Sequence, residues 1–333
     1  MSAQVSLDFN QGKKGVAVAK VEGGDYGGET LYLHDGMNDS KSGKKGVQEL
    51  ELGKHRLGKM PARKQSEVMR TLQEAYKRRI PPEHLNMDHI PGARDAYEEM
   101  VGSAEKQSST QVKLPPGSSF GLIPSQDPKK RQIWYISGAS GAGKSYIAKR
   151  LAEQYMKKFP DRPIYLISKL EEDSTLDSMK TPLIRLNPQK LIDKPIATTA
   201  DMEQLRDSMM IFDDYDTFVG KEGKVIQQLI DDIAVMGRHQ NITMLCLTHY
   251  LSNYKKTRLL LTEASHFVLY PQSAGAHALN YMLKTYLGMG PDEVQKLRKS
   301  ATRWVCIHKN FPLYCITENA AWILNGDEDE VKT

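Results

Sequence analysis

The fold expected of this chain is decided by one stretch, Gly138-Ala139-Ser140-Gly141-Ala142-Gly143-Lys144-Ser145. It fits the P-loop spacing GxxxxGK[ST], in which glycines let successive backbone N–H groups point inward at phosphate oxygens. The residues before it, Gln132 to Ser137, are apolar and β-prone, and residues 146–158 place apolar side chains at helical spacing. A strand, a glycine loop and a helix are the context in which this pattern binds nucleotide phosphates.

The motif predicts a role for each of its residues. Lys144 is expected to reach the β- and γ-phosphates of ATP, and the Ser145 hydroxyl is expected to bind Mg²⁺. The N-terminus of the following helix adds its partial positive charge. The expected nucleotide contacts are Gly138, Ala139, Ser140, Gly141, Ala142, Gly143, Lys144, Ser145 and Tyr146.

Composition narrows the class of protein. A chain of 333 residues is long enough for two domains, or for one large domain with an appendage. Its three cysteines, Cys246, Cys306 and Cys315, form no CxxC pair, which argues against a disulfide framework and a structural zinc site. No signal-peptide pattern and no apolar run of about 18 residues occurs. We therefore expect a soluble protein without a transmembrane segment, in a reducing compartment.

Residues 1–104 are interpreted as a basic N-terminal extension, first β-rich and then helical. Strands are expected at 16–19, 30–33 and 47–52, and helices at 61–80 and 93–104. Between residues 41 and 80, twelve Lys or Arg face four Asp or Glu, which suits either nucleic-acid phosphates or a solvated face.

A short basic repeat stands out in the same extension. The pentapeptide Gly12-Lys13-Lys14-Gly15-Val16 recurs at residues 43–47, each time before an expected strand. Two interpretations remain open, namely a pair of solvated turns and a contact with a phosphate backbone.

The remainder divides into three parts. Residues 105–130, rich in Pro, Ser and Lys, are interpreted as a linker, residues 131–326 as a P-loop ATPase domain, and residues 327–333 as an acidic tail. Within the domain, strands and helices alternate, which predicts an α/β fold with a mostly parallel sheet flanked by helices. Strands are expected at 132–137, 163–168, 183–186, 208–213, 242–247 and 265–270, helices at 144–158, 222–238 and 275–287, and a terminal hairpin at 303–308 and 312–316.

A second motif supplies the metal ligand and the acid. The apolar run Met209-Met210-Ile211-Phe212 ends in Asp213-Asp214, which is the Walker B pattern. Asp213 is expected to hold Mg²⁺, directly or through water. Asp214 is expected to orient or deprotonate the attacking water, as an ATPase requires and a kinase must avoid.

Three further positions are candidates for contacting the terminal phosphate. Thr248 and His249 follow the expected strand 242–247, so their side chains can lie between the γ-phosphate and the water. Arg238 follows a helix and is a candidate for stabilising the developing charge on a neighbouring subunit's nucleotide. Arg258, in Lys255-Lys256-Thr257-Arg258, is its rival and suits DNA equally well.

Residues 131–290 resemble the genome-packaging ATPases of large double-stranded DNA viruses, the poxvirus-like branch of the HerA/FtsK superfamily of P-loop NTPases. The resemblance covers about half the chain. The matching pieces are residues 138–145, Tyr165-Leu166-Ile167-Ser168, Phe212-Asp213-Asp214, Gly237-Arg238-His239-Gln240-Asn241-Ile242-Thr243 and Leu247-Thr248-His249. In one departure, His249 stands where the family commonly has Gln.

The resemblance implies a RecA-like core, a homo-oligomeric ring, pentameric or hexameric, and translocation of double-stranded DNA by ATP hydrolysis. Packaging of a viral genome is the function it favours, with a capsid or membrane-associated viral protein as a partner, in the virion or the cytoplasm of an infected cell. Residues 250–258 are candidates for gripping the DNA backbone. The alternatives are a P-loop kinase of a nucleotide or small metabolite, and a nucleotide-switched assembly module.

Overall fold

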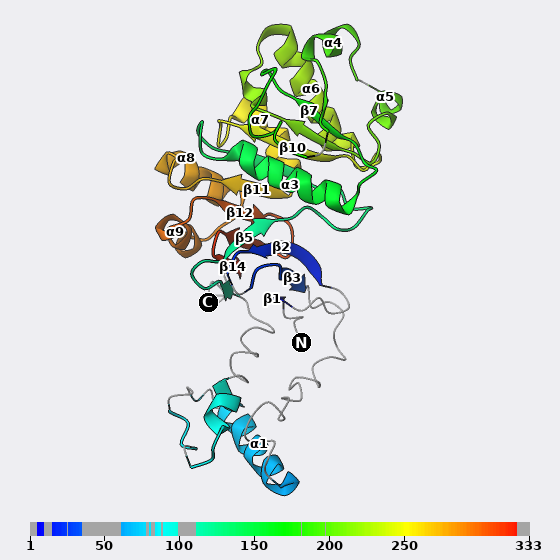
Figure 1. Ribbon diagram of the computed structural model, residues 1–333. Helices are drawn as coiled ribbons and strands as arrows, with labels where there is room; N and C mark the ends of the chain where they lie inside the picture. The colour runs from blue at the N-terminus through cyan, green and yellow to red at the C-terminus, as the bar shows by residue number, and fades with distance from the viewer. Residues whose placement is uncertain are drawn as a thin grey trace.

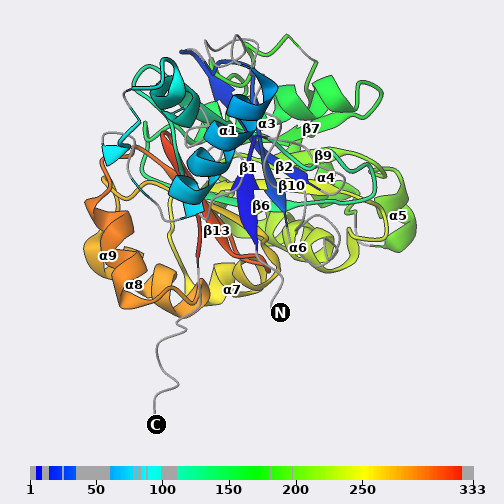
Figure 2. The same ribbon diagram turned by 90° about the horizontal axis from the view of Figure 1, so that it is seen from below.

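The computed structural model describes residues 5–9, 15–24, 26–34, 61–77, 80, 84–87, 89–98, 111–180, 182–196 and 198–324. These residues form one sheet of ten strands, one sheet of four strands, and the helices that cover them (Figures 1 and 2). The predicted strand 47–52, the second copy of the basic repeat at 43–47 and the acidic tail 327–333 lie outside the described residues.

Six parallel strands make up the larger part of the ten-stranded sheet. In spatial order they are β11 (His266–Leu269), β6 (Ile133–Ser137), β10 (Thr243–Thr248), β9 (Met209–Phe212), β7 (Ile164–Ile167) and β8 (Ile184–Arg185). Neighbours pair in parallel throughout this series. One strand, β10, separates the P-loop strand from the Asp213-Asp214 strand, which is the RecA-like arrangement and confirms the predicted fold class.

Four antiparallel strands extend this sheet beyond β11. They are β12 (Val305–His308), β13 (Tyr314–Thr317), β14 (Ala320–Ile323) and β4 (Gln111–Lys113). The hairpin predicted at 303–308 and 312–316 is present as β12 and β13. The two strands beyond it, β14 and β4, were not predicted.

Helices cover both faces of the large sheet, so its central strands are almost wholly buried, whereas β8 and β4 at its two edges are largely exposed. Along β6, Ile133 and Tyr135 face one apolar cluster, and Trp134 and Ile136 face the other. This alternation is what a strand covered on both sides requires. One cluster contains α3 (Lys144–Lys158). The other contains residues of α4 (Pro188–Asp193), α6 (Gly220–Met236), α7 (Tyr254–Glu263), α8 (Ala276–Tyr281) and α9 (Pro291–Lys299).

The predicted helices differ from the observed ones at their ends. The P-loop helix has its predicted bounds, whereas α6 begins and ends two residues before the predicted 222–238. The helix predicted at 275–287 is α8 followed by a π-helical turn, Met282–Tyr286. The short helices α4, α5 (Thr199–Glu203), α7 and α9 were not predicted, and α7 includes part of the segment 250–258 proposed to grip DNA. None of the described helices is both long and apolar enough to cross a membrane.

The four-stranded sheet is antiparallel and packs against the P-loop helix. Its order is β1 (Ser6–Asp8), β3 (Thr30–His34), β2 (Val16–Glu22) and β5 (Ser119–Leu122). Leu31 of β3, Phe120 of β5 and Leu151 of α3 belong to one buried cluster. The N-terminal strands are therefore continuous with the core of the α/β domain.

The segment 105–130, predicted as a linker, contains two strands among its described residues 111–130. β4 pairs with β14 at the edge of the large sheet, and β5 pairs with β2 in the small one. Both strands find their partners far away in the sequence. Pro115-Pro116-Gly117 between them produced the linker interpretation, because these residues also mark turns.

A helical unit lies between β3 and β4 in the chain. It consists of α1 (Ala62–Lys77) and the helical residues 93–98, at the foot of Figure 1. Val68 and Leu72 of α1 pack with Ala93 and Tyr97 in a separate cluster, and the Tyr97 hydroxyl donates to the Ile80 carbonyl at 2.8 Å. The helix predicted at 61–80 is present, and of the one predicted at 93–104 only residues 93–98 are described.

Candidate nucleotide site

The predicted site residues follow three neighbouring strands at the same edge of the sheet. The P-loop follows β6, Asp213-Asp214 follows β9, and Thr248-His249 closes β10 between them. Because these strands are parallel, their carboxyl ends meet at one edge, which is where open α/β sheets bind ligands. The motifs predicted separately from the sequence are thus brought together by the strand order.

The backbone of the P-loop depends on its glycines. Gly141 has a φ of 74° and Gly143 a φ of 114°, values in the left-handed region where a side chain is strained. A Cβ on Gly138 would lie 2.5 Å from Cδ2 of Tyr270, so only glycine fits there. The Gly138 N–H donates to the Thr248 carbonyl at 3.1 Å, which fixes the start of the loop against β10.

Lys144 reaches from the first turn of α3 back across the loop. Its side chain is 6% exposed, and Nζ donates to the Gly138 carbonyl at 3.0 Å. Nζ also lies 3.3 Å from Oδ1 of Asp214. A buried ammonium needs such partners, because an unpaired buried charge is strongly destabilising. The P-loop lysine and the Walker B acid are therefore in contact at the same edge of the sheet.

Asp213 is the more deeply buried of the two acids. It is 3% exposed, and its Oδ2 accepts a hydrogen bond from the Ser168 hydroxyl at 2.9 Å. Burial, and next the neighbouring charge of Asp214, raise the pKa of Asp213 to about 6. A cation at this carboxylate would offset both effects.

The donor set suits magnesium. Carboxylate and hydroxyl oxygens are the ligands that this hard cation prefers, and Asp213 and Ser145 supply one of each type. Ser145 lies half-buried in the first turn of α3. Oδ1 of Asp214 is buried, and the Lys144 ammonium at 3.3 Å is its charged partner among the described residues.

Asp214 belongs to a network with a second acid and a histidine. Its φ of 42° is a strained conformation for a residue other than glycine. Oδ2 of Asp214 lies 3.7 Å from Nε2 of His249, and Oδ2 of Asp216 lies 3.3 Å from Nδ1 of the same ring. Asp216 also accepts the His249 N–H, at 3.3 Å. His249 is thereby held between the two carboxylates.

Asp216 was not among the predicted site residues, although it stands two positions after Asp214. The structure places it in the site through the single turn Tyr215–Thr217, with its side chain only 5% exposed. One potential ligand atom from each of Asp214, Asp216 and His249 lies within 4.8 Å of the other two. The sequence feature that could have identified Asp216 is an acidic residue two positions after the Walker B residue Asp214.

Thr248 is fully buried and rigidly held. Its Oγ1 accepts the Tyr250 N–H at 3.1 Å, which leaves the hydroxyl proton to donate. The hydroxyls of Tyr135 and Ser137 both donate to the Tyr250 carbonyl at 2.6 Å. These bonds fix the segment after β10 to the P-loop strand.

The predicted arginines lie apart from these groups. Arg238 is exposed between α6 and β10, at the amino ends of the parallel strands. Arg131, which donates to the Ile233 carbonyl at 2.6 Å, lies there too; burial lowers its pKa, and the charge of Arg238 lowers it further. The length of β10, about 17 Å, separates this edge from Thr248. Arg258 is exposed on α7.

Arg303, which was not predicted, does contact the P-loop. Its Nε donates to the Ala142 carbonyl at 3.0 Å, and its own N–H donates to Oε2 of Glu318 at 2.8 Å. No local motif marks this arginine, because it reaches the loop from the segment just before β12, 161 positions further along the chain. Its contact lies on the β12 side of the P-loop, opposite β9 and β10.

A cavity of about 670 Å³ borders the loop on that same side. The hydroxyl of Tyr270, a residue that is 2% exposed, is buried there without a hydrogen-bond partner among the described residues. The lining residues are Ala142, Tyr270, Gln272, Ser273, Ala301, Thr302, Arg303 and Glu318.

The strand order and the converging motifs are those of a P-loop NTPase with a RecA-like core. All three cysteines are free and buried, in agreement with the expected lack of a disulfide framework. No protein-family model matches the chain. The Uncharacterized protein V3 of the Sputnik virophage is 29% identical over 247 residues, covering 72% of this chain and 97% of that protein.

Several solved structures are similar in fold. The genome packaging NTPase B204 from Sulfolobus turreted icosahedral virus 2, in complex with AMPPCP, aligns with 54% of this chain and 92% of its own, at 15% identity and a TM-score of 0.37. The cytoplasmic domain of the type VII secretion ATPase EccC from Thermomonospora curvata aligns with 63% of this chain and 28% of its own, at 16% identity and a TM-score of 0.41.

Proposed function

We propose that the protein is an ATP-hydrolysing motor that translocates double-stranded DNA and packages a viral genome into a capsid. The observation that carries the proposal is the convergence of Lys144, Asp213 and Asp214, with Nζ of Lys144 3.3 Å from the Asp214 carboxylate. Such a set binds a triphosphate, its cation and a water. It fits hydrolysis better than transfer to another acceptor, because an acid next to the metal ligand favours attack by water.

Each side chain has a defined task in the proposed reaction. Lys144 meets the β- and γ-phosphates, and the N–H groups of the P-loop bind the same oxygens. Asp214 accepts the proton of the water, and the Thr248 hydroxyl donates to it or to the γ-phosphate. His249, held by Asp216, keeps Asp214 in position. Mg²⁺, held by Asp213 and Ser145, would neutralise charge on the phosphate oxygens.

The proposed position of the base and ribose is on one side of the P-loop. Asp213, Asp214 and Thr248 place the terminal phosphate toward β9 and β10, so the base and ribose extend the other way. The cavity beside Ala142 and Arg303 lies there. We assign it to the nucleoside, with Tyr270 and Arg303 among the residues that line it.

Arg238 is proposed to act on the nucleotide bound by a second subunit. It lies at the opposite edge of its own sheet, so it can serve only a neighbour's nucleotide, as in a ring of five or six copies. Mixing Arg238→Ala subunits with Lys144→Ala subunits should restore part of the lost turnover. The same mixture made with Arg258→Ala tests the alternative candidate, and restoration there but not with Arg238→Ala would assign the role to Arg258. Lack of restoration at every ratio contradicts the role in trans.

The DNA partner rests on the order of motifs along the chain. An Asp-Asp pair, then Arg238-His239-Gln240-Asn241-Ile242, then a strand ending in threonine is the pattern that resembles viral packaging ATPases. Work on a viral genome would place the protein in the infected cell or the virion, next to a capsid or membrane-associated protein.

The decisive experiment measures phosphate release with and without double-stranded DNA, while sedimentation follows assembly. We expect Mg²⁺-dependent release, stimulated by DNA, from an oligomer. Phosphoryl transfer to an added acceptor with little free phosphate would identify a kinase instead. Nucleotide binding with no turnover under either condition would identify an assembly module.

A further inference from the structure

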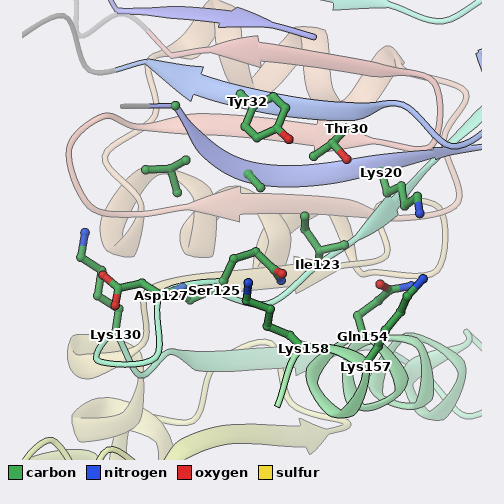
Figure 3. A pocket seen from close by; sticks show the side chains of 14 residues that line it. Lys20, Thr30, Tyr32, Ile123, Ser125, Asp127, Lys130, Gln154, Lys157 and Lys158 are labelled. Carbon is green, nitrogen blue, oxygen red and sulfur yellow. The ribbon is translucent and has the colours of Figure 1, made fainter. Parts of the chain in front are cut away.

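A cleft of about 500 Å³ lies between the small sheet and the far end of α3. It is lined from three places in the chain. These are β2 and β3, the connector 123–130, and the last turns of α3. Figure 3 shows Lys20, Lys130, Lys157 and Lys158 arranged around this hollow, which we call the lysine cleft.

The charges around the lysine cleft are not balanced. Four lysines face one acid, Asp127, whose carboxylate already accepts the Lys129 N–H at 2.9 Å. Within the described part of the chain, none of the four ammonium groups forms an ion pair. Glu22 of β2 and Glu153 of α3 pair with Arg150.

A solvated surface explains only part of this arrangement. Lys157 and Lys158 are in the last turn of α3, where cations are favoured by the helix dipole. Lys20 is half-buried on β2 and Lys130 precedes β6, so neither stabilises that helix end. Like charges from separate segments in one concave site focus a positive potential, which attracts anions.

The neutral groups in the cleft also suit phosphate. Thr30, Tyr32, Ser125 and Gln154 line it and carry hydroxyl or amide donors of the kinds that bind phosphate oxygens without reading a base. Lysines contribute compact, flexible point charges rather than the fixed fork of arginine. Such a set fits a moving, sequence-independent backbone contact better than one tightly held small anion.

The lysine cleft is distinct from the nucleotide site. α3 begins with Lys144 and ends with Lys158, and fifteen residues of helix span about 22 Å. A nucleotide held by the P-loop therefore does not fill the cleft.

We propose that the lysine cleft binds the phosphate backbone of double-stranded DNA. This inference rests on the proposed function for its choice of polyanion, and adds a contact surface that the resemblance did not indicate. One helix then joins the DNA contact to the lysine that grips the triphosphate.

The test compares two variants of the full chain with equal loss of charge. In the cleft variant Lys20, Lys130, Lys157 and Lys158 are all changed to Gln. In the control variant the exposed Lys190, Lys194, Lys221 and Lys299, which lie outside the cleft, are changed to Gln. Anisotropy of a labelled DNA duplex, without nucleotide, gives the affinity over a series of salt concentrations.

We expect the slope of log K against log salt to fall by about 2 to 4 in the cleft variant, at roughly 0.9 per phosphate contact. The control should change it by less than about 1. Changing the same four cleft lysines to Arg should keep the wild-type slope, because the charge remains. Equal slopes for the cleft and control variants, or a loss in the Arg variant as well, would overturn the assignment.

Two further readouts separate the possible failures. Saturable binding of inorganic phosphate by the wild type but not by the cleft variant, with the DNA slope unchanged, would make the cleft a small-anion site and overturn the proposal. ATP turnover without DNA should be the same in the cleft variant, since no cleft residue touches the nucleotide. A wild type that hydrolyses ATP but binds no DNA would contradict the proposed motor as well as the cleft.

Discussion

The two ends of α3 hold positive charge in opposite ways. At the N-terminal end Lys144 is 6% exposed and lies beside both a carboxylate and a carbonyl. At the C-terminal end Lys157 and Lys158 are exposed, have no ion pair among the described residues, and join two lysines from elsewhere. A paired, buried cation suits one fixed ligand, whereas unpaired cations in an open cleft suit a polymer that must slide.

The largest effect should come from the buried end. Lys144→Ala removes the cation that meets the triphosphate, and we expect ATP turnover to fall by about a hundredfold to a thousandfold. Lys149→Ala, one turn further along α3 and paired with Glu153 at 3.8 Å, is the matched control and should keep turnover. Phosphate release measures both, and equal activity of the two variants would remove the P-loop from the mechanism.

Asp214→Asn separates chemistry from binding. Loss of the group that accepts the water's proton should lower turnover by about a hundredfold or more, while ATP affinity stays close to the wild type. Binding of a fluorescent ATP analogue and phosphate release would be measured on the same preparation. A drop in affinity as large as the drop in turnover would assign Asp214 to binding alone.

The raised pKa of Asp213 predicts a pH dependence of stability. Its pKa is raised from 3.8 to about 6, so between these values the folded state keeps a proton that the unfolded state has lost. The metal-free protein should therefore lose stability as pH rises from about 4 to 6, by on the order of 3 kcal/mol. Asp213→Asn should remove this loss, and Mg²⁺ should reduce it above pH 6. Urea unfolding with a chelator measures it, and parallel curves for wild type and variant would contradict the prediction.

The nucleoside cavity should give a smaller effect. Ala301→Trp places a bulky ring at its wall, and we expect ATP affinity to fall by about tenfold while the affinity for inorganic tripolyphosphate is unchanged. Ala278→Trp, on the exposed face of α8 and outside the cavity, is the control. Equal losses for ATP and tripolyphosphate would place the effect in the P-loop rather than beside it.

The contrast between the two ends of α3 also explains which functional residues could be predicted from the sequence. The residues of the nucleotide site lie within short motifs, because a loop, a strand end and a helix start impose fixed spacing on Lys144, Asp213 and Thr248. Arg303 and Lys20 act through contacts made far along the chain, so no local spacing marks them. The same reason hid β4 and β5, whose partners are β14 and β2. The predicted roles of Arg238, Thr248 and His249 stay predictions.

The pairing of β5 determines which segments of the chain can be deleted without removing a strand from the small sheet. β5 supplies the fourth strand of the small sheet, and the other three come from residues 6–34. The chain therefore completes that sheet only after residues 35–118, which lie between β3 and β5 in the sequence. Truncating the chain before residue 81 would strip away three of those strands and expose the apolar side of α3. Excising residues 35–110 and bridging the gap with glycine and serine would remove no described strand. We expect the excised protein to melt within about 4 °C of the full chain and to retain ATP turnover. A large loss of thermal stability or of ATP turnover would show that the excised segment 35–110 supports the motor directly.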